Sequence, residues 1–191
     1  VAADLERNVL IQEVRKLREP NVRGDVQSAE SAWSEGRLDH FAPFVEGWDV
    51  ADCRTRPNRV GDFTHWRVTD SDRLHLAVGS AHGLTNKQLS SASFKAAHAA
   101  HTAHDPDVKQ LFDRVNQTLW TSSIEGDASS LFHGILDPTC GSLVYGLAGG
   151  IFGYILRPHG WEPLLAGKST VGMDCDFQVE MHRQSLMPGD V

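Results

Sequence analysis

The stretch that most constrains the fold is residues 60–83, VGDFTHWRVTDSDRLHLAVGSAHG. Residues 60–68 are rich in β-branched and aromatic side chains, and every second residue from Leu74 to Val78 is apolar. This pattern predicts two half-buried strands joined by a polar turn. Because a hairpin pairs its two far ends, we expect Asp62 and Ser80 to lie side by side, and we expect any chemistry there.

The composition is that of one ordinary globular domain. The chain has 191 residues, of which 40% are hydrophobic and 23% are charged. Its net charge of -7 argues against a nucleic-acid partner, since phosphate backbones are bound by Lys and Arg. The three cysteines lie far apart without C-x-x-C spacing, which favours reduced thiols in the cytoplasm over a zinc site. The longest apolar run, residues 143–156, is interrupted by glycines and is too short to cross a membrane.

The two ends of the chain suggest a piece of a longer protein. Residues 1–24 are expected to be an N-terminal helix or a linker from an upstream domain, because residues 2–19 show partial helical spacing before Pro20. Residues 25–191 are expected to form the domain itself. We expect it to lack its C-terminal end, because residues 186–191 resemble a turn that leads into a further strand.

Two helices are expected after the hairpin. Residues 84–103 are rich in alanine and form the first. Asp105 is expected to cap the second helix, with Pro106 at its first position, and apolar residues from Val108 to Leu119 follow with helical spacing. This second helix is therefore expected to pack on the core.

Three histidines recur on the first helix at three-residue intervals: His98, His101 and His104. Such spacing brings side chains near one another and suits a metal site. We expect a histidine-rich surface instead, because no Cys or carboxylate completes a four-ligand shell.

Further strands are predicted on both sides of these helices. Their residues are 48–51, 131–136, the stretch from Leu143, 152–157, 161–165 and 177–181. This order predicts an α+β fold, an αββα layered sandwich of two antiparallel sheets flanked by helices.

The order of the motifs resembles the PPM-type (protein phosphatase 2C-like) metal-dependent phosphatases, in the bacterial branch of the sporulation stage II E and RsbU regulators. The matching segments are 45–51, 56–57, 60–63, 74–83, 105–106, 115–116, 136–138 with 141, 148–149, 160, 171–172 and 188–190. The resemblance implies hydrolysis of phosphoserine or phosphothreonine by a water that bridges two Mn²⁺ or Mg²⁺ ions. Such a pair of cations needs several carboxylate ligands.

The resemblance makes Asp62 the candidate metal ligand and catalytic residue. The residues expected to bind around it are Gly61, Trp66, His82 and Gly83. Ser80 stands where the family has a ligand Asp, and a hydroxyl has no charge with which to bridge two cations. Two further positions depart from the family pattern: His65 replaces an Asp, and Gly150 replaces a His.

Three functional hypotheses follow. The favoured one is a phosphatase-type regulatory domain of bacterial sigma-factor signalling that is catalytically impaired, with Mn²⁺ or Mg²⁺ bound if it is active and otherwise no cofactor. The second is an active phosphatase whose remaining ligands lie beyond residue 191. The third is a non-enzymatic α+β protein-binding module. The expected partners are a phosphoprotein such as an anti-sigma antagonist and an upstream sensor domain in the same chain, with a homodimer left open.

Overall fold

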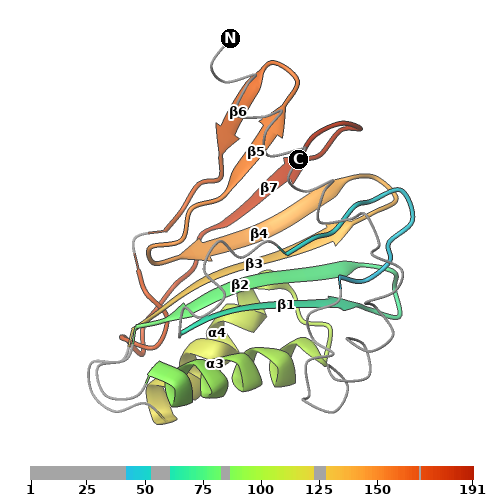
Figure 1. Cartoon of the computed structure of the whole chain (residues 1–191). Helices are drawn as coiled ribbons and strands as arrows, with labels where there is room; N and C mark the ends of the chain where they lie inside the picture. The colour runs from blue at the N-terminus through green and yellow to red at the C-terminus, as the bar shows by residue number, and fades with distance from the viewer. Residues whose placement is uncertain (1–41, 53–60, 83–86, 123–127, 168) are drawn as a thin grey trace, which may run out of the picture.

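The computed structural model describes residues 42–52, 61–82, 87–122, 128–167 and 169–191 (Figure 1). The elements are, in order, β1 (Asp62–Val68), β2 (Leu74–Ala81), α3 (Lys87–Thr102), α4 (Val108–Ser122), β3 (Ser129–Asp137), β4 (Ser142–Ala148), β5 (Tyr154–Arg157), β6 (Gly160–Pro163) and β7 (Met181–Ser185). The helix or linker predicted for residues 1–24 and the first residues of the predicted domain lie outside the described ranges. Neither described helix is long and apolar enough to span a membrane.

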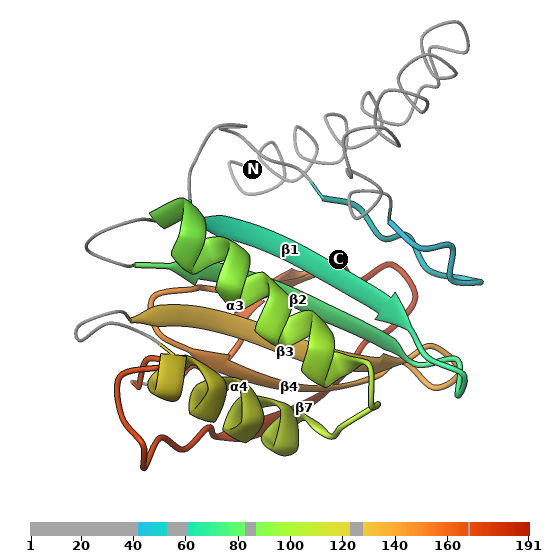
Figure 2. The ribbon, with the colours of Figure 1, turned by 90° about the horizontal axis from the view of Figure 1, so that it is seen from below.

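The strands form two antiparallel sheets, which confirms the predicted α+β class. The larger sheet has the order β1-β2-β3-β4-β7, and β5 pairs with β6 in a separate two-stranded sheet. Figure 2 shows both helices against the same face of the larger sheet. In the part of the chain that the structure describes, the second helix layer of an αββα sandwich is therefore not seen.

The predicted hairpin is confirmed together with its register. Asp62 pairs with Ser80 at one end of the ladder, and Val68 pairs with Leu74 at the turn. Asp72 adopts a φ of 57° in this turn, a conformation that Asp tolerates better than most residues. The period-two alternation sends Phe63 toward the helices and Asp62 to the opposite face.

The two faces of the larger sheet carry separate cores. The helix side packs Phe63, Ala77, Leu131 and Ile135 against apolar residues of α3 and α4. The helix-free side contains Val45, Leu74, Leu136, Leu143, Tyr145 and Leu147, with Trp48, Ile151 and Leu164 packed on them. The N-terminal segment 42–52 and the chain around β5 and β6 thus cover the helix-free face.

Three local predictions were wrong. Residues 48–51 are not a strand: Val45 and Trp48 close a tight turn with Gly47 at a φ of 77°. The last strand begins at Met181 rather than at residue 177. The cap of α4 is Asp107, whose Oδ1 accepts a hydrogen bond of 2.7 Å from the Gln110 N–H, and not Asp105.

Candidate functional site

Three polar residues meet at one end of the larger sheet, on its helix-free face. Asp62, Ser80 and Ser130 are register neighbours on β1, β2 and β3. The Ser80 hydroxyl donates a hydrogen bond of 2.6 Å to Asp62 Oδ1. The hairpin thus brings together the two residues that the sequence singled out, and it joins them directly.

Ser130 forms a second polar contact at this end. Its Oγ accepts a hydrogen bond of 2.9 Å from the Gly150 N–H and lies 2.9 Å from His82 Nε2. The neighbouring Gly149 has a φ of 79°, and a Cβ atom there would lie 2.3 Å from Ser130 Oγ. His82, which was predicted to bind a ligand, therefore ties the end of β2 to β3. The adjacent Gly83 lies outside the described residues.

A second carboxylate near this end was missed by the sequence analysis. Thr64 lies two residues along β1 from Asp62 on the same face, and its hydroxyl donates a hydrogen bond of 2.9 Å to Asp52 Oδ2. No motif pointed to Asp52, because it belongs to a segment without regular structure that reaches β1 only in the folded chain. The sequence around Asp52 contains no motif or residue spacing that would have marked it as a site residue.

The other two predicted binding residues have structural roles. Gly61 has a φ of 113°, and a Cβ atom there would lie 2.9 Å from the Ala81 carbonyl oxygen. This close approach accompanies a hydrogen bond from the Ala81 N–H to the Gly61 carbonyl. Trp66 packs on the core of the helix-free face, two residues beyond Thr64.

Among the residues that the structure describes, the donor set around Asp62 does not fit a two-metal centre. A hard divalent cation prefers several oxygen ligands, and two such cations close together need several carboxylates. Here the side chain that faces Asp62 across the ladder is a neutral hydroxyl. Within the described ranges, the one group of three metal-type donors within 4.8 Å is Asp174, Cys175 and Asp176, all exposed.

That acidic group lies away from Asp62. Its loop is held by Asn116 of α4, which donates a hydrogen bond of 2.8 Å to the Asp174 carbonyl and accepts one of 2.8 Å from the Gly172 N–H. Asn116 is buried in the helix layer, whereas Asp62 and Ser80 lie on the opposite face of the sheet. The exposed group therefore does not complete a site with Asp62.

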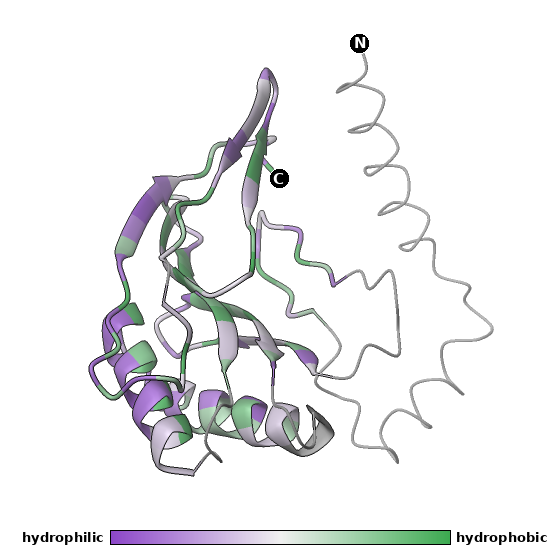
Figure 3. Ribbon diagram, turned by 90° about the vertical axis from the view of Figure 1, so that its left-hand side faces the viewer, coloured by the Kyte–Doolittle hydropathy of each residue, from purple (hydrophilic) through white to green (hydrophobic). Residues whose placement is uncertain are grey.

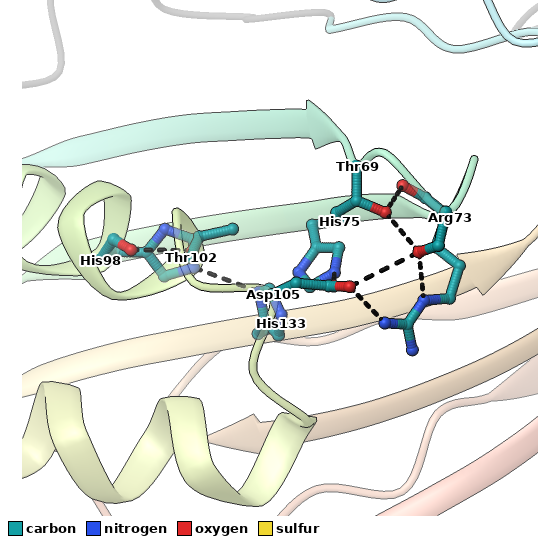
Figure 4. Close-up of polar contacts among 8 residues, drawn as sticks. Thr69, Arg73, His75, His98, Thr102, Asp105 and His133 are labelled. Atoms are coloured by element: carbon teal, nitrogen blue, oxygen red, sulfur yellow. Dashed lines mark hydrogen bonds and ion pairs between the residues drawn. The ribbon is translucent and has the colours of Figure 1, made fainter.

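Of the three histidines that were predicted to form a surface, His98 does not lie on it, and His104 follows the end of α3. His98 is fully buried and lies 3.1 Å from His133 of β3, measured from Nε2 to Nδ1. His101 is half-buried against Thr118, and His104 is exposed. The prediction failed at His98 because this side chain contacts His133 of β3, a residue distant in sequence, between α3 and the larger sheet (Figure 4).

Residues 70–191 match the family model described as Stage II sporulation protein E (SpoIIE). A comparison with curated proteins gives no match. Among solved structures, the chain is similar to the RsbU and RsbW domains of Rv1364c from Mycobacterium tuberculosis, with a TM-score of 0.61, 18% identity and coverage of 72% of this chain and 39% of that chain. It is also similar to the PP2C phosphatase domain and regulatory fragment of SpoIIE from Bacillus subtilis, with a TM-score of 0.57, 20% identity and coverage of 68% and 38%.

A third similar structure is RsbX in complex with magnesium, with a TM-score of 0.54, 18% identity and coverage of 78% of this chain and 68% of that chain. At these identities the structural matches establish the fold. The chain spans 39% and 38% of the length of the first two structures, so it corresponds to a part of each.

Proposed function

Because the chain belongs to the stage II sporulation protein E family, we propose that it is a phosphatase-type regulatory domain of bacterial sigma-factor signalling with impaired or absent catalysis. Similarity to RsbU, RsbX and SpoIIE structures supports the regulatory setting. The proposed partners are a phosphoprotein such as an anti-sigma antagonist and an upstream sensor domain, and the proposed location is the cytoplasm.

The observation that carries the impairment is the hydrogen bond between Ser80 and Asp62. Phosphate-ester hydrolysis in this family is implied to use two Mn²⁺ or Mg²⁺ ions, which polarise the phosphate and supply the attacking water. A carboxylate at residue 80 would face Asp62 across the ladder and add a negative charge where those ions are held. Ser80 instead donates a hydrogen bond of 2.6 Å to the Asp62 carboxylate, so the pair carries one negative charge.

Asp62 is the residue on which any remaining metal binding or turnover should depend. Asp52 accepts a hydrogen bond from Thr64, which lies two residues along β1 from Asp62, and so adds a second negative charge beside this strand. Each of these two carboxylates accepts a hydrogen bond from a hydroxyl group, and two carboxylates suit a weakly bound single cation better than a bridged pair.

Hydrolysis of p-nitrophenyl phosphate in the presence of Mn²⁺ tests this proposal, with the wild-type chain and Asp62→Ala measured side by side. We expect the two proteins to show equal, background-level rates. Robust wild-type turnover that Asp62→Ala abolishes would contradict the proposed impairment but would support the location of the site at Asp62. Robust turnover that survives Asp62→Ala would mean that the site lies elsewhere.

A further inference from the structure

Four histidines from four elements form a continuous row between the larger sheet and α3. His65 on β1 and His133 on β3 flank the small Ala77 of β2 in the ladder, and the ring of His98 reaches between them from α3. The ring centroid of His98 lies 5.2 Å from that of His65 and 5.1 Å from that of His133. His75 on β2 continues the row, 5.3 Å from His133 (Figure 4). We call this set the histidine row.

A carboxylate stands at one end of the histidine row. Asp105 Oδ1 accepts a hydrogen bond of 2.9 Å from His75 Nε2, and Asp105 Oδ2 pairs with Arg73 at 2.6 Å. Burial disfavours the charge on Asp105, but these two hydrogen bonds outweigh it and lower the pKa of the carboxyl group. The Asp105 carboxylate therefore interacts with His75 and Arg73, at the outer end of the row.

The two central rings of the row, His98 and His133, have basic side chains around them. The charged and titratable groups that act on the row come from the sheet, from α3 and from the segment before α4: His65 and Arg67 on β1, Arg73 just before β2, His75 on β2, His98 and His101 on α3, and Asp105. Arg114 of α4 and His104 act in turn on His101. Within the described ranges, the groups that act on His98 and His133 are histidines. A proton on either ring would thus add a positive charge that none of these neighbours balances.

Burial already keeps these two rings neutral. His98 and His133 are 0% exposed. Burial and then the neighbouring histidines lower the pKa of His98 to about 3. The same causes hold the pKa of His133 well below its ordinary value. In the neutral pair one nitrogen donates and the other accepts. Among the residues that the structure describes, His98 Nδ1 and His133 Nε2 have no hydrogen-bond partner that could accept from an added N–H.

The histidine row contributes more to the packing of α3 on the sheet than to the packing of α4. Among the α3 side chains that the structure describes, the buried ones are Phe94, His98 and Thr102, at four-residue intervals. By contrast, α4 buries Val108, Leu111, Phe112, Val115, Asn116 and Leu119. Figure 3 shows the same difference, because hydrophobic and hydrophilic stripes are distinct on α4 and weak on α3. A charge on His98 would lie at the centre of the α3 stripe.

We propose that the histidine row makes the packing of α3 on the sheet acid-sensitive: α3 stays docked while His98 and His133 are neutral, and it opens when they take up protons. The pKa of both residues is lower in the docked state than in the open state, so the open state binds more protons. Their contribution to docking is complete above the ordinary histidine pKa of about 6.5 and decreases as the pH falls below it. This inference does not depend on metal binding at Asp62.

Hydrogen exchange of backbone amides at pH 7.5 and pH 5.5, corrected for intrinsic exchange rates, tests the proposal on the intact chain. Each of the two histidines should favour the open state about tenfold over this interval. Protection of α3 amides should therefore fall about a hundredfold relative to α4 in the wild type.

The matched variant is His98→Gln with His133→Asn, because the Gln and Asn amides can replace the Nε2 and Nδ1 atoms of the hydrogen bond without titrating. Its α3 protection should change less than about tenfold over the same interval. The control His104→Gln removes an exposed histidine and should behave as the wild type. Equal loss of α3 protection in the double variant and the wild type would overturn the proposal.

Histidine NMR resonances of the wild type give a test that does not require the variant to fold. The imidazoles of His98 and His133 should stay neutral in the folded chain down to about pH 5, since burial disfavours their charged forms. A midpoint near the ordinary value for either ring would overturn the proposal.

Discussion

At the scale of single residues, the chemistry of the candidate site depends on which side chains lie opposite each other in the β1–β2 strand pair. Asp62 and Ser80 are directly opposite each other, and the hydroxyl binds the carboxylate at 2.6 Å. The same pairing of Asp with Ser occurs between Asp137 and Ser142 at the other end of the sheet. Ser142 therefore offers a control position for substitutions at Ser80.

Ser80→Asp should lower the melting temperature by about 3 °C in metal-free buffer, which corresponds to about 1 kcal/mol. The cause is the loss of the hydrogen bond and the repulsion between two carboxylates. If residue 80 is the missing ligand position, millimolar Mn²⁺ should reverse the loss. Differential scanning calorimetry in EDTA and in Mn²⁺ measures both effects.

The control for this prediction is Ser142→Asp, which also places a carboxylate opposite an Asp in a strand pair. Its melting temperature should not respond to Mn²⁺. Recovery of both variants, or of neither, would contradict the assignment of residue 80 to a metal site.

Gly79→Ala should destabilise the hairpin by about 2 kcal/mol. A Cβ atom at residue 79 would lie 2.2 Å from the Phe63 ring, which is buried and packed edge-on against Phe94 at 4.9 Å. At Gly150 the nearest atom to a Cβ is Ser130 Oγ at 4.0 Å, so Gly150→Ala is the control and should change little. Urea denaturation measures both variants, and a neutral Gly79→Ala would contradict the packing described.

At the scale of elements, the parts that were predictable from sequence are those with local determinants. The alternation of residues 60–83 was sufficient for the β1–β2 register, and the buried face of α4 follows the predicted apolar spacing. The burial of His98 was not predictable, because it depends on His133 from a strand 35 residues away. The turn at Trp48 likewise depends on a distant contact, a hydrogen bond of 3.0 Å from its ring N–H to the Pro138 carbonyl.

Asp107→Ala should destabilise the protein by about 1 kcal/mol, because Asp107 caps α4. The control Asp113→Ala removes an exposed carboxylate that pairs with Lys109 on the same helix and should have little effect. Chemical denaturation measures the difference. Equal stability of the two variants would contradict the assignment of Asp107 as the cap.

At the scale of the whole molecule, the larger sheet separates two regions with different chemistry. Its helix side contains the histidine row, and its helix-free side contains Asp62 and Ser80. The sequence predicted that Asp62 and Ser80 would meet, since the hairpin determines that contact. It did not predict Asp52, which reaches Thr64 from outside the sheet. Sequence therefore located the candidate site but did not supply its full set of charges.

Calorimetric titration of the wild-type chain with Mn²⁺ tests the central claim most directly, with Ser80→Asp and Asp62→Ala titrated under the same conditions. The incomplete site predicts no micromolar binding to the wild type, at least tenfold stronger binding to Ser80→Asp, and none to Asp62→Ala. Micromolar binding of two Mn²⁺ ions to the wild type that Asp62→Ala removes would contradict it.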